Sequence, residues 1–366
     1  MSLSREIASF LSDDGVRCLR DELQRPETQK IHPVLASILL HLDPAWRPDR
    51  AAQRNLRNAT LTRARWSGLS LRRVELTGSD LRDAHLVRAN LTLATAVATN
   101  FRCSNLRHAV LGRIHATGAC FACCELTGVL ATNGSFRGAD FANANAAGGR
   151  FLGAIFTEAE LTECCFHKAA MRQCEFHLAN LTLTDFSDAD LTGARLTNVS
   201  LQSTVLTGTI LEHAVLDSSD LEFVDLPNAR CSGASLATAI LTASSMPDGD
   251  FRNSRLTNAY LAEIDWPGAD LRDADLRGCT FHMGSSRSGL VSSDLAGEGS
   301  HTGFYSNGYD DHLYKLPEEI RAANLCNADL RGANIIGVDF YRVDLRRAKY
   351  DRKQRAQLVG TGAILE

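Results

Sequence analysis

The chain of 366 residues lacks several common signatures. It contains no run of about eighteen apolar residues, so no membrane-spanning helix is expected. Met1 to Phe10 carries Arg5 and Glu6 within a short amphipathic segment, which does not match a secretion signal. These two absences predict a cytoplasmic protein.

Motifs for nucleotide and metal chemistry are also missing. No G-x-G-x-x-G opens a helix, and neither G-x-x-x-x-G-K-[ST] nor H-E-x-x-H occurs. The 11 His are scattered along the chain and form no ligand spacing. We therefore expect a protein that is not an enzyme, with no catalytic residue, no cofactor and no resident metal.

What the chain does contain is a repeat of five residues. From Leu56 to Phe281 a central residue returns at every fifth position, and most of these residues are Leu or Phe. None of them is charged, and the residue two places earlier is usually small, as at Ala59 or Ala139. A period of five is neither the 3.6 of a helix nor the 2 of a strand. The chain must instead turn a corner every five residues.

Such self-similarity predicts a solenoid, in which each turn buries its apolar side chains only by stacking on its neighbours. Four five-residue sides would give a coil of twenty residues. Pro227, Pro247 and Pro267 are spaced by twenty and each follows a central residue directly. Because proline lacks an N–H, it belongs where that group is not needed for stacking. The recurring proline therefore supports a four-sided coil.

Repeat cores such as Ala89-Asn90-Leu91, Ala139-Asp140-Phe141, Ala189-Asp190-Leu191 and Ala269-Asp270-Leu271 resemble those of the pentapeptide-repeat family. The resemblance covers roughly three quarters of the chain and implies an all-β solenoid, a right-handed quadrilateral parallel β-helix. Adjacent coils of such a helix should be separated by about 4.8 Å, as neighbouring strands are.

The repeat divides the chain into five parts. Residues 1–50 lack the register and are predicted to be an α-helical N-terminal region that caps the first coil, either alone or together with a partner-binding or dimerising role. The main β-helix occupies 51–283, an insertion loop 284–321, and resumed coils 322–350. A short helical C-terminal cap is expected at 351–366, where Ile364 and Leu365 are candidates for contact with a second copy in a homodimer.

Charge is distributed unevenly along the repeat. Residues 57–113 hold ten Arg against three acidic residues, a net charge of +7, whereas residues 120–230 hold six basic against fourteen acidic residues, a net charge of −8. We call these the basic segment and the acidic segment. Within the latter, a twenty-residue coil places Asp140, Glu160 and Asp220 in one outward column and Glu125, Asp185 and Asp225 in another. These carboxylates either attract a partner or simply keep the surface solvated.

The insertion loop is the second candidate for partner binding. The segment 296–316 holds three of the 6 Tyr of the chain. Long loops on a rigid scaffold commonly carry binding residues, and tyrosine is favoured at interfaces. The alternative is an aromatic flap folded on the coils. The candidate contact residues are Phe304, Tyr305, Tyr309, His312 and Tyr314.

The 11 Cys need a separate explanation. Several, such as Cys124 and Cys174, fall at the small inward position, where cysteine acts as a small hydrophobic residue. Cys103, Cys120 and Cys123 form a cluster that is either a zinc site or a set of ordinary outward positions, and the absence of a second C-x-x-C pair favours the latter.

Two functions remain. The first is a non-enzymatic scaffold that binds a protein partner. The second follows from the resemblance: quinolone-resistance members of the family mimic duplex DNA and occupy type II topoisomerases such as DNA gyrase or topoisomerase IV. The acidic segment and the interrupting loop favour mimicry, whereas the basic segment and the helical start oppose it. Direct nucleic-acid binding through arginines such as Arg63 and Arg65 is not favoured at a sequence pI of 6.3.

Overall fold

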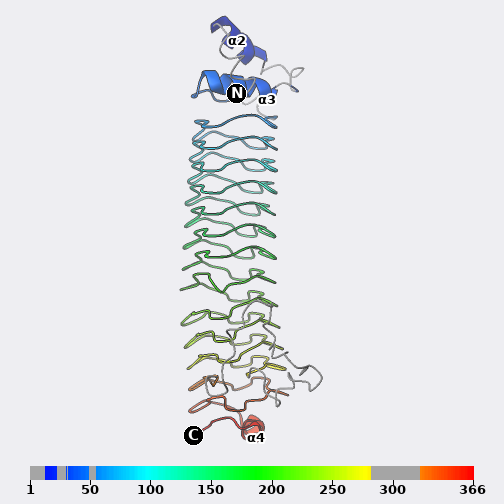
Figure 1. Cartoon of the computed structure of the whole chain (residues 1–366), viewed down its shortest axis with the longest axis vertical. Coiled ribbons are helices and arrows are strands. Elements are labelled where there is room, and N and C mark those ends of the chain that lie inside the picture. The colour runs from blue at the N-terminus through cyan, green and yellow to red at the C-terminus, as the bar shows by residue number, and fades with distance from the viewer. Residues whose placement is uncertain (1–12, 23–29, 31, 49–54, 282–321) are drawn as a thin grey trace, which may run out of the picture. The chain divides into compact units, whose positions relative to one another are not determined.

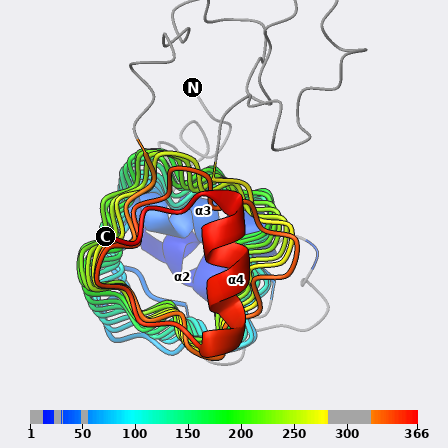
Figure 2. The ribbon, with the colours of Figure 1, turned by 90° about the horizontal axis from the view of Figure 1, so that it is seen from below.

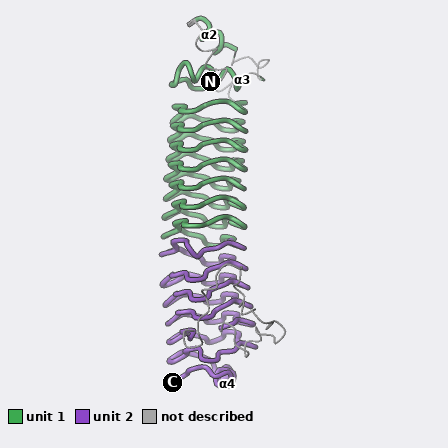
Figure 3. The backbone as a smooth tube through the Cα atoms, in the orientation of Figure 1, with its two compact units in different colours: residues 1–195 green, residues 196–366 purple. Residues whose placement is uncertain are grey.

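The computed structural model describes residues 13–22, 30, 32–48, 55–281 and 322–366. The chain forms two compact units, unit 1 from Met1 to Arg195 and unit 2 from Leu196 to Glu366 (Figure 3). The described helices are α2 (Asp13–Glu22) and α3 (His32–Leu42) in unit 1 and α4 (Arg352–Thr361) in unit 2. None of these helices is long and apolar enough to cross a membrane, a finding that covers the described residues only.

Both units consist of stacked coils of twenty residues (Figure 1). Every fifth residue forms a parallel β-bridge with the residue twenty positions further on, from Asn55↔Glu75 to Glu175↔Arg195 in unit 1. In unit 2 the same pattern includes Ser200↔Asp220 and continues at every fifth residue from Ile210↔Arg230 to Tyr260↔Thr280. The predicted twenty-residue, four-sided coil is therefore confirmed within each unit.

Hydrogen bonding explains why five residues make one side. Counting from a bridge residue such as Thr60, the next N–H, that of Leu61, donates to the following coil at Asp80 O, and Arg63 N–H donates to Arg82 O. Ala64 N–H closes the corner by donating to Leu61 O. The bridge residue itself donates backwards, as Asp80 N–H does to Ala59 O. Only the N–H of the residue after the centre has no backbone acceptor in this scheme.

The N–H that has no backbone acceptor explains the position of the prolines. Pro227, Pro247 and Pro267 occupy the position whose N–H takes no part in stacking, while their carbonyls remain available. Pro247 O accepts from Asn228 N–H and Pro267 O accepts from Asp248 N–H, both at 2.8 Å. The prediction that proline stands where its missing N–H is not needed is thus confirmed.

The last corner residue of most sides has a left-handed backbone, with φ near +55° to +75°. Glycine adopts this conformation without steric cost, and Asn and Asp tolerate it better than most residues. Gly332, for example, has a φ of 75° and packs against the side chain of Asp273 one coil earlier. Leu, Phe and Arg also occupy this position elsewhere, so stacking overrides the local preference.

The core of each unit is a line of buried central residues. Phe101, Phe121 and Phe141 stack along unit 1 with ring centroids 4.9 and 4.8 Å apart. In unit 2, Phe251 and Trp266 stack at 4.4 Å. Small inward residues fill the space between these large ones, and both classes are almost fully buried.

Helix α3 covers the first coil of unit 1. Its inner face buries Leu35, Ala36 and Ile38. The hydroxyl of Ser37 accepts a hydrogen bond from Thr60 N–H at 2.8 Å, replacing the carbonyl that a preceding coil would supply. Helix α3 therefore satisfies an edge that would otherwise be open.

Helix α4 plays the same part in unit 2, where it lies across the end of the last coil (Figure 2). Gln354 Nε2 donates to the carbonyls of Leu330 and Ala333, both at 2.9 Å. Gln357 Nε2 donates to Val338 O at 3.0 Å. Leu358 is completely buried, and Gly362 ends the helix in a left-handed conformation.

The coils continue after the insertion. Asp265 pairs with Asn324 and Thr280 with Asp339, so bridge partners that are twenty apart elsewhere are 59 apart here. The difference of 39 is one residue short of a multiple of five, which accounts for the shifted register of the resumed cores.

The fold is therefore an all-β solenoid of the predicted type, with a single bridge residue on each side in place of long strands. Right-handedness remains a prediction, as does the five-part division of the chain.

Candidate interaction surfaces

The bridge residues form outward columns, because each pairs with the equivalent residue of the next coil. In unit 1 one column runs Cys120, Asp140, Glu160, Asn180. A second runs Glu125, Asn145, Cys165, Asp185. Asp140 and Glu160 are thus neighbours on successive coils, whereas three coil steps separate Asp185 from Glu125.

The other two predicted carboxylates belong to unit 2. Asp220 lies between Ser200 and Ile240 in its column. Asp225 pairs with Ser245, which pairs in turn with Asp265. Each predicted acidic residue occupies an outward column, but in unit 2 neutral residues separate them.

Most of these carboxylates have a structural role in addition to their charge. They accept the one N–H that the backbone leaves without an acceptor, two residues further along. Asp140 Oδ1 accepts from Ala142 N–H at 2.9 Å, and Asp185 Oδ1 accepts from Ser187 N–H at 2.8 Å. Asn and Asp favour such turns because their short side chains reach the backbone two residues on. An acidic or amide residue before the central Leu is thus favoured by the coil itself.

Asp225 differs because Pro227 follows it and offers no N–H. This carboxylate therefore has no corner N–H to cap. Sequence alone distinguishes this case, because the proline stands two residues after the acid.

Glu160 is the most strongly bonded of the predicted acids. Partial burial by itself would raise its pKa, but hydrogen bonds from the hydroxyl of Thr162, the amide of Asn180 and the N–H of Thr162 outweigh this effect and lower the pKa. Both carboxylate oxygens accept from Asn180 Nδ2 at 2.9 Å. Glu160 is therefore held ionised and oriented along the column.

Two of the outward cysteines, Cys120 and Cys165, donate hydrogen bonds to carboxylates of the next coil. The thiol of Cys120 donates to Asp140 Oδ2 at 3.5 Å, and that of Cys165 to Asp185 Oδ2 at 3.7 Å. Burial raises the pKa of both thiols, which keeps them protonated. Cys103 and Cys123 are exposed. No group of three or more potential ligands among the described residues is placed to hold a metal ion.

The inward cysteines do more than fill space. Cys124 Sγ donates to Phe101 O at 2.8 Å and Cys174 Sγ to Phe151 O at 3.1 Å, in each case the carbonyl 23 residues earlier. Ser104 and Thr184 make the equivalent bond to Leu81 O and Leu161 O. A polar residue at the small inward position is thus tolerated because it bonds to the preceding coil.

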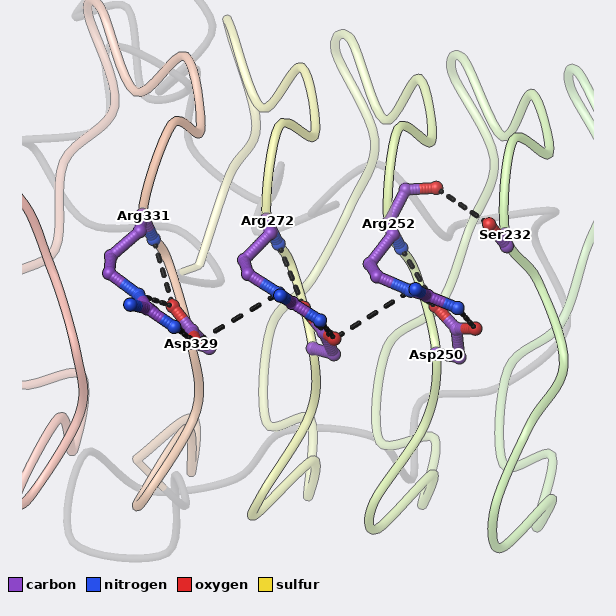
Figure 4. Close-up of polar contacts among 7 residues, drawn as sticks. Ser232, Asp250, Arg252, Arg272, Asp329 and Arg331 are labelled. Atoms are coloured by element: carbon purple, nitrogen blue, oxygen red, sulfur yellow. Dashed lines mark hydrogen bonds and ion pairs between the residues drawn. The ribbon is translucent and has the colours of Figure 1, made fainter.

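One face of unit 2 carries a ladder of alternating charges that the sequence reasoning missed (Figure 4). Each rung is an Asp and an Arg two residues apart, on either side of a central residue. In Asp250–Arg252, Asp270–Arg272 and Asp329–Arg331 the guanidinium Nη2 lies 2.6 to 2.7 Å from Oδ2. Weaker contacts of 3.7 Å (Arg252–Asp270) and 4.0 Å (Arg272–Asp329) join successive coils. The repeated D-x-R pattern in the sequence could have indicated these ion pairs.

The ladder neutralises its own acids. Hydrogen bonds from Arg252, Arg272 and Arg331 hold the pKa values of Asp250, Asp270 and Asp329 below the ordinary range. Because each negative charge has a positive partner at contact distance, this face presents little net field to a partner.

Large apolar residues at a few corners are the most unusual surface feature. Leu178 and Leu183, at successive corners of unit 1, are 55% and 54% exposed. Phe223, at a corner of unit 2, is 60% exposed. All three have a positive φ, between 56° and 59°, which is unfavourable for a bulky side chain. The sequence could have indicated these corners, because each has a large apolar residue two places after the central residue of the repeat. Polar residues and glycine predominate at that position elsewhere.

The predicted aromatic contact residues Phe304, Tyr305, Tyr309, His312 and Tyr314 lie outside the described residues. Their role in partner binding stays a prediction.

Comparison with known families agrees with this architecture. A family profile described as pentapeptide repeats matches in eight copies, over residues 55–92, 135–173, 166–198, 194–230, 219–258, 254–284 and 320–349. The chain belongs to the pentapeptide-repeat family. These matches include both the main coils and the coils after the insertion.

Solved pentapeptide-repeat structures resemble parts of the chain. HetL from the cyanobacterium Nostoc, described as involved in heterocyst differentiation regulation, is 26% identical, covers 64% of this chain and 91% of its own, and has a TM-score of 0.25. QnrB1, a plasmid-mediated fluoroquinolone resistance protein, is 16% identical, covers 64% and 90%, and has a TM-score of 0.30. A thylakoid-lumen protein from Arabidopsis thaliana is 25% identical over 31% and 64%, with a TM-score of 0.18.

A search of curated proteins found no match. The assignment to the family therefore depends on the repeat profile and on the coils described above.

Proposed function

We propose that this pentapeptide-repeat protein is a non-enzymatic, cytoplasmic scaffold that binds a protein partner through its outward corners. The observation that carries the proposal is the set of exposed apolar corners, Leu178, Leu183 and Phe223. Each places a large apolar side chain in water on a backbone conformation that disfavours it. Exposed apolar and aromatic groups of this kind are typical of the anchors of protein interfaces.

The coil suits such a role because most of its backbone N–H groups are hydrogen-bonded. Successive coils satisfy the N–H groups of each side, and side-chain caps satisfy many of the rest. Outward side chains are therefore held on a rigid support, which lowers the ordering cost of binding.

Substitution of Phe223 by Asn tests the proposal. Asn tolerates a positive φ better than Phe, so Phe223→Asn should keep or slightly raise the thermal stability. Capture of the partner by the purified variant should fall by roughly tenfold or more, as for a central interface anchor. Ala98→Asn, at another corner with a φ of 51°, is the matched control and should retain binding. Unchanged capture by Phe223→Asn and by the double variant Leu178→Asn/Leu183→Asn would contradict the proposal.

A second candidate is a DNA mimic that binds DNA gyrase or topoisomerase IV. The neighbouring carboxylates of Asp140 and Glu160 favour it. Duplex DNA carries one negative charge per about 1.7 Å of axis, however, whereas coils recur only every 4.8 Å or so. Several continuous acidic columns would be needed to match that density, and neutral residues interrupt the acidic columns of this chain. Scaffolding is therefore the first proposal.

A supercoiling assay separates the two candidates. Purified gyrase is assayed with increasing amounts of this protein, with and without a fluoroquinolone. A DNA mimic should inhibit supercoiling or protect the enzyme from the drug, and Asp140→Asn/Glu160→Gln should weaken that effect. A lack of both effects at large molar excess would leave the scaffold as the proposal.

A further inference from the structure

Unit 1 contains a surface pocket of about 340 Å³ near the junction between α3 and the first coils. Its lining residues are Arg47, Arg65, Ser67 and His85. All four carry hydrogen-bond donors, and no acidic residue is among them. The volume falls in the range of small-molecule sites.

Arg65 and His85 are brought together by the coil register. They are bridge partners on successive coils, with Trp66 N–H donating to His85 O at 2.9 Å and His85 N–H to Ala64 O at 2.8 Å. Side chains in this relation are separated by about the spacing of neighbouring strands, near 4.8 Å. The column continues through the neutral Asn105, and its first carboxylate, Glu125, is three coils from Arg65.

Arg47 reaches the same place from the segment that follows α3. Trp66 Nε1 donates to Trp46 O at 3.0 Å, and the two indole rings pack edge to face at 6.2 Å. Pro48 follows and is buried, so the backbone of Arg47 is restricted to extended conformations. The guanidinium is thus presented from a backbone that is fixed on both sides.

Neither guanidinium has a carboxylate partner among the described residues. Other arginines of the first coils do: Arg57 pairs with Glu75 at 3.2 Å and Arg82 with Asp80 at 2.7 Å. Asp43, the acidic residue nearest to Arg47 along the described chain, is already bonded to Arg20 at 3.3 Å and to Ala45 N–H at 2.9 Å. The pocket therefore concentrates positive charge that the described part of the protein does not neutralise.

We propose that this pocket binds the phosphate group of a small phosphorylated molecule. A planar carboxylate has two oxygens, and a single guanidinium fork can engage both of them. A phosphate group offers three terminal oxygens, enough for the forks of Arg47 and Arg65 together with an imidazole N–H of His85. The hydroxyl of Ser67 donates to His85 O at 3.4 Å, so this residue lines the pocket without being counted as a donor to the ligand. The remaining volume accommodates the organic part of the ligand. This site is independent of the apolar corners proposed above to bind a protein.

The test is a calorimetric titration of the full chain with inorganic phosphate and with pyrophosphate at fixed ionic strength. Saturable binding with one site per chain is expected. Arg65→Ala and Arg47→Ala should each weaken it by roughly tenfold or more, since each removes a charge-assisted hydrogen-bonding group. Arg65→Lys keeps the charge but loses the fork and should be intermediate. Arg63→Ala, two residues away on the same coil, is the matched control and should change affinity less than about twofold.

Three outcomes would overturn the proposal. The first is the absence of saturable phosphate binding. The second is a loss of phosphate affinity in Arg63→Ala as large as that in Arg65→Ala, which would indicate only the general electrostatic field of the basic segment. The third is that a short duplex DNA binds and responds to Arg63→Ala as strongly as to Arg65→Ala, which would indicate nucleic-acid binding along the arginines. Unchanged thermal unfolding of each variant shows that a loss of affinity is not a loss of fold.

Discussion

At the residue scale, hydroxyl groups at the small inward position of the coil differ in their hydrogen bonding. Several bond to the preceding coil, and one does not. Ser104 Oγ donates to Leu81 O at 2.6 Å and accepts from Ala84 N–H at 3.1 Å. Ser254 Oγ occupies the equivalent position, is buried, and has no hydrogen-bond partner among the described residues. Residues of one type at equivalent positions therefore differ in their contribution to stability.

Because of this difference, replacing serine by alanine should change the free energy of unfolding in opposite directions at the two positions. Ser254→Ala removes a buried hydroxyl that is not hydrogen-bonded and should raise the free energy of unfolding by about 1 kcal/mol. Ser104→Ala loses two hydrogen bonds and should lower it by about 1 to 2 kcal/mol. Urea unfolding monitored by circular dichroism measures both. Destabilisation of equal size in the two variants would show that Ser254 is hydrogen-bonded in solution.

Corner glycines provide a second contrast. Gly332 and Gly337 share a φ of 75°. A Cβ at Gly332 would overlap Asp273 Oδ1, whereas a Cβ at Gly337 would meet no atom within 4 Å. Gly337→Ala should thus cost only the conformational penalty of about 1 to 2 kcal/mol, and Gly332→Ala should cost more.

A double variant separates the two causes. Adding Asp273→Ala to Gly332→Ala removes the overlap. Because Asp273 has a φ of 59°, the double variant is compared with Asp273→Ala alone, and the further loss of stability should equal that of Gly337→Ala, as judged by urea midpoints. If the double variant is as unstable as Gly332→Ala, the corner conformation alone accounts for the cost.

At the element scale, the Asp–Arg ladder should make stability depend on pH. The pKa values of Asp250, Asp270 and Asp329 are lowered in the folded chain, chiefly by hydrogen bonds from their arginines. A lowered folded-state pKa contributes stability above the unfolded-state value, near 4, and this contribution is lost as the pH falls through the folded-state pKa. Because the pairs are partly exposed, the effect is small for each pair.

The triple variant Asp250→Asn/Asp270→Asn/Asp329→Asn tests this expectation. Asn can still cap the corner N–H, so only the charge is removed. The variant should be less stable than the natural chain at pH 7, and the difference should shrink as the pH falls below about 4. Thermal unfolding across pH 3 to 7 measures it. A difference that stays constant over this range would exclude the ladder as its source, and Asp225→Asn, before Pro227, serves as the control.

Helix α4 is tied to the last coil by two glutamines, Gln354 and Gln357. Gln354 bonds to two coil carbonyls, and its Oε1 accepts from Asp351 N–H at 2.7 Å. Gln354→Leu fills similar volume but leaves those carbonyls without a donor, so it should cost about 2 to 3 kcal/mol. Limited proteolysis should cleave first within 351–366. Arg355→Leu, at an exposed position of the same helix, is the control and should show no such effect.

At the scale of the whole molecule, the terminal segment can act as a cap or as a dimer contact. Deletion of residues 351–366 exposes the carbonyls of Leu330, Ala333 and Val338 together with the apolar end of the last coil. If the segment is a cap, the full chain is monomeric and the deletion causes self-association. If it forms a homodimer, the full chain is dimeric and the deletion gives monomers. Light scattering distinguishes the two, and we expect the first result.

How much of the fold and of the candidate sites could be predicted from the sequence depends on how far apart along the chain the residues of each feature lie. The inward residues, the twenty-residue coil and the resumption after the insertion follow from a local period, because every side solves the same packing problem. The Asp–Arg rungs also lie within three residues and were readable in principle. The Arg47 pocket was not, because nothing in the local pattern relates residue 47 to residues 65 and 85.

The sequence by itself determined that this chain is a solenoid with a uniform apolar interior, since a strict period of five fits neither a helix nor a strand and requires a corner every five residues. Tertiary structure alone decided which outward groups are available. Stacking places residues twenty positions apart in contact, or 59 apart across the insertion. In this way it commits Asp140 and Asp185 to backbone N–H groups, and it pairs Asp250 with Arg252 and Arg252 with Asp270. Arg47, Arg65 and Phe223 are left exposed.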